Sequence, residues 1–128
     1  MPASTHISLS ELQALIKRGI DNAHPLPYWV TAEISELKVN YSGHCYIELV
    51  EKGGANHVPK AKASAVIWRS GYSMIASYFQ GATGQVLAAG LKVLVKVVVS
   101  YHELYGLSLQ ITDIDPTYTL GDMERQRQ

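Results

Sequence analysis

The order of apolar and polar positions predicts two kinds of element along the chain. Apolar residues recur at helical spacing near the start, and after Pro27 they follow a period of two, in which every second residue faces a core. Turns rich in glycine and asparagine separate the period-two segments, which continue almost to Pro116. We therefore predict strands over residues 30–38, 44–50, 62–69 and 91–101, and a fifth that starts at residue 107.

Helical spacing predicts three further segments. The first begins after Ser8, which has a glutamate three residues later at the spacing of a capping box, and Gly19 with Asp21-Asn22 signals its exit. A short helix is predicted over residues 72–79, closed by Gly81. Residues 121–128 have the pattern of the first turns of a charged helix, and eight residues do not hold an isolated helix.

Five strands with a helix between the third and fourth are the element order of an OB-fold, an all-β Greek-key barrel. This order predicts three parts of the chain. Residues 1–24 form an N-terminal capping helix and a lead-in containing prolines, and residues 25–116 form the barrel domain, which is expected to bind nucleic acid. Residues 117–128 start a linker or helix toward a further domain that this chain does not include.

Composition limits the class of protein. The chain has 128 residues, of which 47% are hydrophobic and 17% charged, as expected for one globular domain. Cys45 is the only cysteine, which excludes an internal disulfide framework. The first residues lack the pattern of a secretion signal, and no apolar run reaches the roughly 20 residues that span a bilayer. We therefore expect a cytoplasmic protein without a membrane partner.

Charge is unevenly distributed although the formal net charge is zero. Residues 60–112 carry five basic residues against the single acidic Glu103, a net charge of +4, and the segments on either side each carry −2. A basic centre between acidic ends permits an anionic partner such as nucleic acid, but a charge of this size does not require one.

The sequence contains no pattern that predicts catalysis or a cofactor. The five histidines lack the spacing of zinc ligands, so we expect no metal site. Gly53-Gly54 and the glycines at 81 and 84 lack the lysine–serine ending of a phosphate loop, and there is no nucleophile elbow. Glu33 has no second carboxylate at a motif spacing and is expected to bind a neighbouring donor.

Binding of single-stranded nucleic acid needs aromatic faces for the bases and cations for the phosphates. Tyr46 and Trp68 alternate against the apolar face of their strands, so both are expected to point outward onto one surface. For both, the alternative is packing over an open end of the barrel or under the N-terminal helix, and for His44 a structural hydrogen bond to a neighbouring loop is preferred. The complete candidate set is Lys38, Tyr41, His44, Tyr46, Lys62, Trp68, Arg69, Lys96 and Tyr105.

Four segments resemble one known family. They are W-V-T-A-E-I-S at 29–35, S-G-H-C-Y-I-E-L at 42–49, A-V-I-W-R at 65–69 and G-L-K-V-L-V at 90–95. In this order and spacing they resemble the start of the large subunit of bacterial exodeoxyribonuclease VII, over about residues 28–121. Three positions depart from that pattern: Ala32 replaces a glycine, Ser64 a basic residue and Tyr105 an arginine. The last two reduce the positive charge expected for binding.

The resemblance implies an OB-fold that binds single-stranded DNA and presents it to a nuclease domain elsewhere in the parent chain. It also implies that the parent is a DNA exonuclease, whose small subunits bind a C-terminal region that this chain does not include. The catalytic residues would then lie outside this sequence. Two alternatives remain at this point: a protein–protein docking module within the exonuclease assembly, and an OB-fold that binds RNA such as a tRNA.

Overall fold

The computed structural model describes residues 5–53 and 55–126. The first four residues of the predicted segment 1–24 and the last two of the predicted segment 117–128 lie outside the described residues, as does Gly54 of the predicted Gly53-Gly54 turn. No helix in the described part of the chain is long and apolar enough to cross a membrane.

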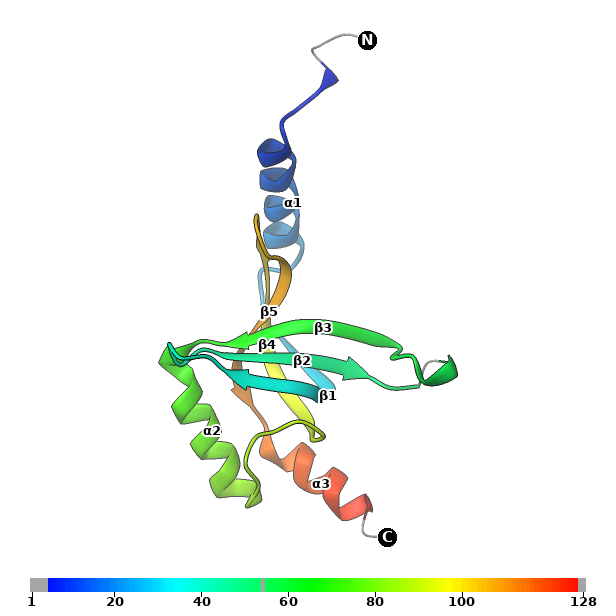
Figure 1. The fold of residues 1–128 in the computed structure, drawn as a ribbon, viewed down its shortest axis with the longest axis vertical. Helices are drawn as coiled ribbons and strands as arrows, with labels where there is room; N and C mark the ends of the chain where they lie inside the picture. Colours follow the sequence, from blue (N-terminus) through cyan, green and yellow to red (C-terminus); the bar gives the residue numbers. More distant parts are fainter. Residues whose placement is uncertain (1–4, 54, 127–128) are drawn as a thin grey trace.

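The predicted order of elements is confirmed, with five strands and a helix between the third and fourth. In chain order the elements are α1 (Leu9–Ala23), β1 (Tyr28–Val39), β2 (Cys45–Glu51), the short 3-10 helix η2 (Ala55–His57), β3 (Ala61–Ile67), α2 (Arg69–Thr83), β4 (Lys92–His102), β5 (Gly106–Ile114) and α3 (Pro116–Gln126). In Figure 1, α1 stands on one side of the crossing β2 and β3, and α2 and α3 lie on the other.

The five strands close into a barrel in the order β1-β2-β3-β5-β4. Strand β1 pairs with β4 through its first half and with β2 through its second, and the register shifts between Ile34 and Glu36, where the strand passes from one partner to the other. A short parallel contact between β3 and β5, at Ala65 and Leu109, completes the closure. This pairing confirms the OB-fold predicted from the element order.

Alternation along the strands places the core as the sequence predicts. On β2, Cys45, Ile47 and Leu49 are buried, while Tyr46 faces outward. Burial raises the pKa of the Cys45 thiol to about 11, so the thiol is neutral near pH 7, as expected for a small buried side chain. Helix α2 adds Phe79, which is completely buried in the same core.

The end of α1 follows its predicted signal, and the end of α2 differs from the prediction. The Ser8 capping box is present, and α1 ends at Ala23, directly after the exit signal of Gly19 with Asp21-Asn22. Helix α2 passes Gly81 and ends at Thr83, and its C-cap Gly84, with a φ of +73°, closes it in the left-handed conformation that glycine adopts without strain. A glycine inside a helix costs about 1 kcal/mol, so the predicted stop at Gly81 was too early because one such residue does not end a helix.

The third predicted strand is two residues too long. Strand β3 ends at Ile67, Trp68 is the N-cap of α2, and Arg69 is the first residue of that helix. Trp68 continues the inward–outward alternation of the strand because an N-cap residue, like a strand residue, has extended backbone angles. Val66 was expected on the outer face but is also buried, with 4% of its surface exposed.

Helix α3 begins at Pro116, five residues before the predicted start. Asp115 caps it, since its carboxylate accepts hydrogen bonds from both the backbone N–H and the hydroxyl of Thr117, which lowers the pKa of Asp115. Proline suits the first helical position because its φ is already helical. The buried hydroxyl of Thr119 donates to the Lys92 carbonyl oxygen at 2.6 Å, so α3 packs on β4.

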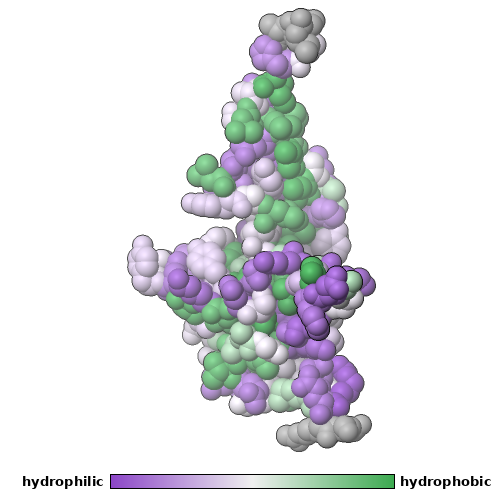
Figure 2. Space-filling view, turned by 45° about the vertical axis from the view of Figure 1, so that its right-hand side comes forward, coloured by the Kyte–Doolittle hydropathy of each residue, from purple (hydrophilic) through white to green (hydrophobic). Residues whose placement is uncertain are grey.

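Helix α1 projects from the barrel, and none of its residues is buried. Four of its apolar residues are 38–71% exposed, namely Leu9, Leu12, Leu15 and Ile16. Figure 2 shows apolar side chains along the part of the molecule that projects upward, which contains α1. Polar contacts attach it to the β4–β5 hairpin: Gln13 Nε2 donates to the Glu103 carbonyl oxygen at 2.7 Å, and Lys17 Nζ donates to the Tyr101 carbonyl oxygen at 3.4 Å.

Candidate nucleic-acid interface

The turn between β1 and β2 lies directly against the start of α2, and Gly43 makes this contact possible. Its φ is +93°, and a Cβ at this position would lie 3.1 Å from Cγ of Arg69. Any other residue would be strained by its backbone angle and crowded by the arginine stem. The glycine of the S-G-H motif therefore allows the Arg69 side chain to lie across the turn.

His44 holds this turn to the helix. Its backbone N–H donates to Oδ1 of Asn40 at 3.0 Å, and its Nδ1 accepts a hydrogen bond from the backbone N–H of Arg69 at 3.0 Å. Because Trp68 makes no side-chain cap, His44 provides the acceptor for the first N–H of α2 from another part of the chain. The structural hydrogen bond preferred for His44 is present, but its partner is the first residue of α2 instead of a neighbouring loop.

The His44 ring also contacts two partly exposed aromatic side chains. Its centroid lies 5.1 Å from that of Trp68 and 6.5 Å from that of Tyr46, both in edge-to-face geometry. Trp68 is 42% exposed and Tyr46 is 45% exposed. We call these three residues the aromatic corner. They share one surface, as predicted for Tyr46 and Trp68, although Trp68 reaches it from the N-cap of α2 instead of from β3.

Two cations flank the aromatic corner. Lys38 pairs in register with Tyr46 across β1 and β2, so both side chains leave the same face of the sheet. Arg69 follows Trp68 and lies over the turn. Within residues 5–53 and 55–126, the structure shows no ion pair to either side chain, and both residues are exposed. Both charges are therefore available to a phosphate.

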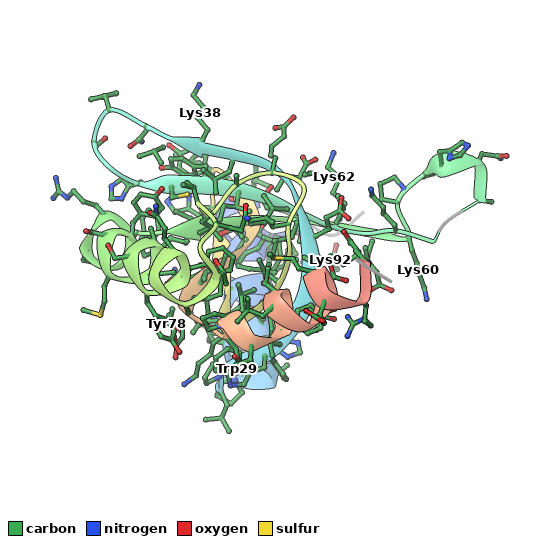
Figure 3. The ribbon with its side chains drawn as sticks, turned by 90° about the horizontal axis from the view of Figure 1, so that it is seen from below. Trp29, Lys38, Lys60, Lys62, Tyr78 and Lys92 are labelled. Atoms are coloured by element: carbon green, nitrogen blue, oxygen red, sulfur yellow. The ribbon has the colours of Figure 1, made fainter. Side chains whose placement is uncertain are left out.

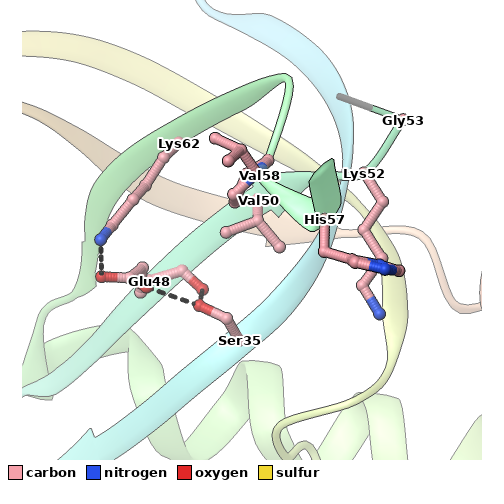
Figure 4. A pocket seen from close by; sticks show the side chains of 9 residues that line it. Ser35, Glu48, Val50, Lys52, Gly53, His57, Val58 and Lys62 are labelled. Atoms are coloured by element: carbon pink, nitrogen blue, oxygen red, sulfur yellow. Dashed lines mark hydrogen bonds and ion pairs between the residues drawn. The ribbon is translucent and has the colours of Figure 1, made fainter. Parts of the chain in front are cut away.

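Lys62 lies on the same side of the molecule as Lys38 (Figure 3), but its charge is already balanced. Its Nζ lies 3.2 Å from Oε2 of Glu48, and the hydroxyl of Ser35 donates to Oε1 of the same carboxylate at 2.8 Å. The hydrogen bonds from Ser35 and Lys62 lower the pKa of Glu48, which keeps the carboxylate ionised at neutral pH. This network borders a pocket of about 470 Å³, with Val50 and Val58 on its wall (Figure 4).

The lysines around the β2–β3 loop are balanced in the same way. Lys52 Nζ lies 3.0 Å from Glu33 Oε2, which confirms that Glu33 binds a neighbouring donor. Lys60 Nζ lies 3.6 Å from Glu51 Oε2. Of the five basic residues counted over residues 60–112, Lys60, Lys62 and Lys92 each lie beside a carboxylate, and Arg69 lies at the aromatic corner. Lys38, the other cation there, comes from the acidic first segment of the sequence.

The three remaining candidates, Tyr41, Tyr105 and Lys96, are not part of the aromatic corner. Tyr41 is at the tip of the β1–β2 turn and is fully exposed. Tyr105 is at the tip of the β4–β5 hairpin, stacked on His102 with centroids 4.7 Å apart. Lys96 is half-buried on β4, where it pairs in register with Trp29 of β1. Trp29 precedes Lys38 on β1 by nine residues, which is about 30 Å along an extended strand.

Sequence reasoning missed the acidic partners and the role of Gly43. Alternation places Glu48 on the same face as Tyr46, but only the register of β2 against β3 brings it opposite Ser64 and within reach of Lys62. Gly43 and Arg69 are 26 residues apart, and no local pattern indicates that they touch. The glycine of the S-G-H motif was the available signal, because glycine is the residue found where a turn needs a positive φ or another segment approaches closely.

Comparison with known proteins gives a family and a longer relative. Residues 7–115 match the family described as "OB-fold nucleic acid binding domain". The chain is 38% identical over 125 residues to the exodeoxyribonuclease 7 large subunit of Deinococcus radiodurans. This match covers 94% of the chain and 30% of that relative, so the chain spans under a third of its length.

Solved structures give more distant matches. The N-terminal domain of PriB from Thermoanaerobacter tencongensis has a TM-score of 0.44 at 11% identity, over 71% of this chain and 94% of that one. A mitochondrial single-stranded DNA-binding protein of S. cerevisiae has a TM-score of 0.46 at 11% identity, over 70% and 90%. A small single-stranded DNA-binding protein of Streptomyces coelicolor has a TM-score of 0.44 at 12% identity, over 70% and 90%.

Proposed function

The chain belongs to the family of OB-fold nucleic-acid-binding domains, and we propose that it binds single-stranded DNA through the aromatic corner. The observation that carries this proposal is the association of His44, Tyr46 and Trp68 with two cations that lack an acidic partner in the described residues. Exposed aromatic faces stack on any base, and nearby cations neutralise phosphates, which together give binding with little sequence preference.

We further propose that this module presents the strand to a nuclease domain of a longer protein. The 38% identity to an exodeoxyribonuclease large subunit, of which this chain matches 30%, supports that context. The proposed partners are single-stranded DNA, the catalytic domain of the same parent and the small subunits of the exonuclease, and the proposed location is the cytoplasm. The catalytic residues would lie outside this chain.

Titration of a fluorescently labelled oligo-dT of about 20 nucleotides tests the proposal. Fluorescence anisotropy at low and at moderate salt should show binding that weakens as salt rises, because phosphate contacts release counterions. Unlabelled single-stranded DNA should compete, and duplex DNA should not. Absence of binding at tens of micromolar protein in low salt, or equal competition by duplex DNA, would refute the proposal.

Lys38 and Lys62 should contribute differently to the salt dependence. Lys38→Ala removes an unpaired cation, so the slope of log affinity against log salt should fall by about 0.7, the value for one phosphate contact on a single strand. Lys62→Ala removes a lysine already paired with Glu48, and its slope should stay closer to that of the unaltered protein. Both variants are measured by the anisotropy titration at four or more salt concentrations.

The variant Glu48→Gln serves as the matched control. It removes the negative charge beside Lys62 and should strengthen binding at low salt, since Lys62 then becomes available to a phosphate. If Lys62→Ala flattened the salt dependence as much as Lys38→Ala did, the conclusion that Glu48 neutralises Lys62 toward DNA would be wrong.

A further inference from the structure

A second surface lies away from the aromatic corner. It is a groove of about 710 Å³ between α2, the start of β1 and the end of β5. Figure 3 shows Trp29 and Tyr78 on the side of the molecule opposite to Lys38 and Lys62. Its lining residues are Trp29, Met74, Ile75, Tyr78, Thr112, Asp113, Ile114 and Asp115.

The groove has a buried apolar floor and exposed aromatic walls. Ile75 and Ile114 are 7% and 3% exposed, whereas Trp29 is 49%, Tyr78 54% and Met74 76% exposed. Tryptophan, tyrosine and methionine are enriched at protein–protein interfaces, where the aromatic residues often carry most of the binding energy. The walls therefore offer an apolar side chain a place between two aromatic rings.

Two carboxylates lie on the rim. Asp113 and Asp115 line the groove, and no lysine or arginine is among the lining residues that the structure describes. Among the described residues, the hydrogen bonds to both carboxylates engage Oδ1, from the Ile114 N–H and from Thr117, so Oδ2 of each is able to accept from a ligand. Carboxylates in this position repel a phosphate backbone, so the groove is poorly suited to nucleic acid.

Lys96 is the basic residue that pairs in register with Asp113. It lies on β4 in register between Trp29 and Asp113, but it does not line the groove and forms no ion pair within the described ranges. Asp113 and Trp29 are two strand spacings apart, about 10 Å. An extended segment covers that distance in three residues, so a basic and an apolar side chain of one segment reach both positions.

We propose that this groove docks a segment of a partner protein in which an arginine or lysine lies within three residues of a large apolar side chain. The apolar side chain packs between Trp29 and Tyr78 over Ile75, and the cation binds Asp113. Arginine fits better than lysine because its planar guanidinium stacks on an indole ring and pairs with a carboxylate through two hydrogen bonds. The proposal is independent of DNA binding at the aromatic corner.

Selection from random twelve-residue peptides displayed on phage tests the chemistry of the partner. The full chain is the target, and a variant carrying both Trp29→Ala and Tyr78→Ala removes peptides that bind elsewhere. We expect the surviving peptides to carry arginine or lysine within three residues of leucine, isoleucine, phenylalanine or tryptophan. Survivors that are acidic or without a cation, or no survivors that depend on the groove, would overturn the proposal.

Titration of the best synthetic peptide separates this surface from the DNA surface. Asp113→Asn should weaken the peptide about tenfold and leave oligo-dT binding unchanged, since the amide lacks the negative charge that binds the cation. Lys38→Ala should weaken oligo-dT and leave the peptide unchanged. An equal loss of peptide binding in both variants, or displacement of the peptide by oligo-dT, would contradict the proposal. Circular dichroism verifies that each variant is folded.

Discussion

Replacement of Phe79 by alanine should lower the free energy of unfolding by about 3–5 kcal/mol, the usual cost of removing a buried phenylalanine. Phe79 is the only phenylalanine of the chain and is 0% exposed, and it connects α2 to the core formed by the barrel strands. A typical domain is stable by about 5–15 kcal/mol, so this single change should remove a large part of the stability. Urea unfolding followed by circular dichroism should show this loss of stability as a lower midpoint concentration of urea, with the dependence of the unfolding free energy on urea unchanged.

Tyr78→Ala provides a matched control for that measurement. Tyr78 is the adjacent aromatic residue on the same helix, but it is 54% exposed, so its removal should cost no more than about 1 kcal/mol. If the two variants lost similar stability, α2 would not be anchored to the core through Phe79, and the packing described here would be wrong.

Replacement of Trp68 by alanine should weaken oligo-dT binding by about five- to a hundredfold, the effect expected for one stacked base. The loss should persist at every salt concentration, because stacking does not release counterions. The helix should remain intact, since the Trp68 side chain makes no cap and the first N–H of α2 is bound by His44. Anisotropy titrations at low and moderate salt measure the change in affinity.

Two further variants show whether the aromatic face itself is responsible. Trp68→Phe keeps an aromatic ring at the corner and should restore much of the lost affinity. Trp29→Ala removes the other tryptophan, on the opposite side of the molecule, and should leave oligo-dT binding unchanged. Equal losses in Trp29→Ala and Trp68→Ala would argue against the aromatic corner as the DNA surface.

Local patterns were sufficient to predict the five strands and most of their core faces, with Val66 on β3 the exception. The alternation at Cys45, Ile47 and Leu49 identified the buried face of β2, because the side chains of a strand point to opposite sides in turn. The capping box at Ser8 identified the start of α1, because both of its hydrogen bonds are made within three residues. Element ends were less predictable, since Gly81 is tolerated inside its helix.

The candidate site was predicted in part. Tyr46 and Trp68 were expected on one surface and lie there, joined by His44. The charges were harder to assign, because a lysine is available to a phosphate only if no carboxylate is near it. The pairing of Lys62 with Glu48 depends on the register between two strands, which alternation within one strand does not specify.

By itself, the sequence determined which residues form strands, which faces are buried and in what order the elements follow, since these features arise from the spacing of neighbouring side chains. Only the tertiary structure decided that Gly43 lies under Arg69, that His44 caps α2, and that Lys38 remains unpaired while Lys62 does not. It also separated the aromatic corner from the groove lined by Trp29 and Tyr78. The reason is physical: these relations depend on strand register and barrel closure, which bring together residues far apart in the chain.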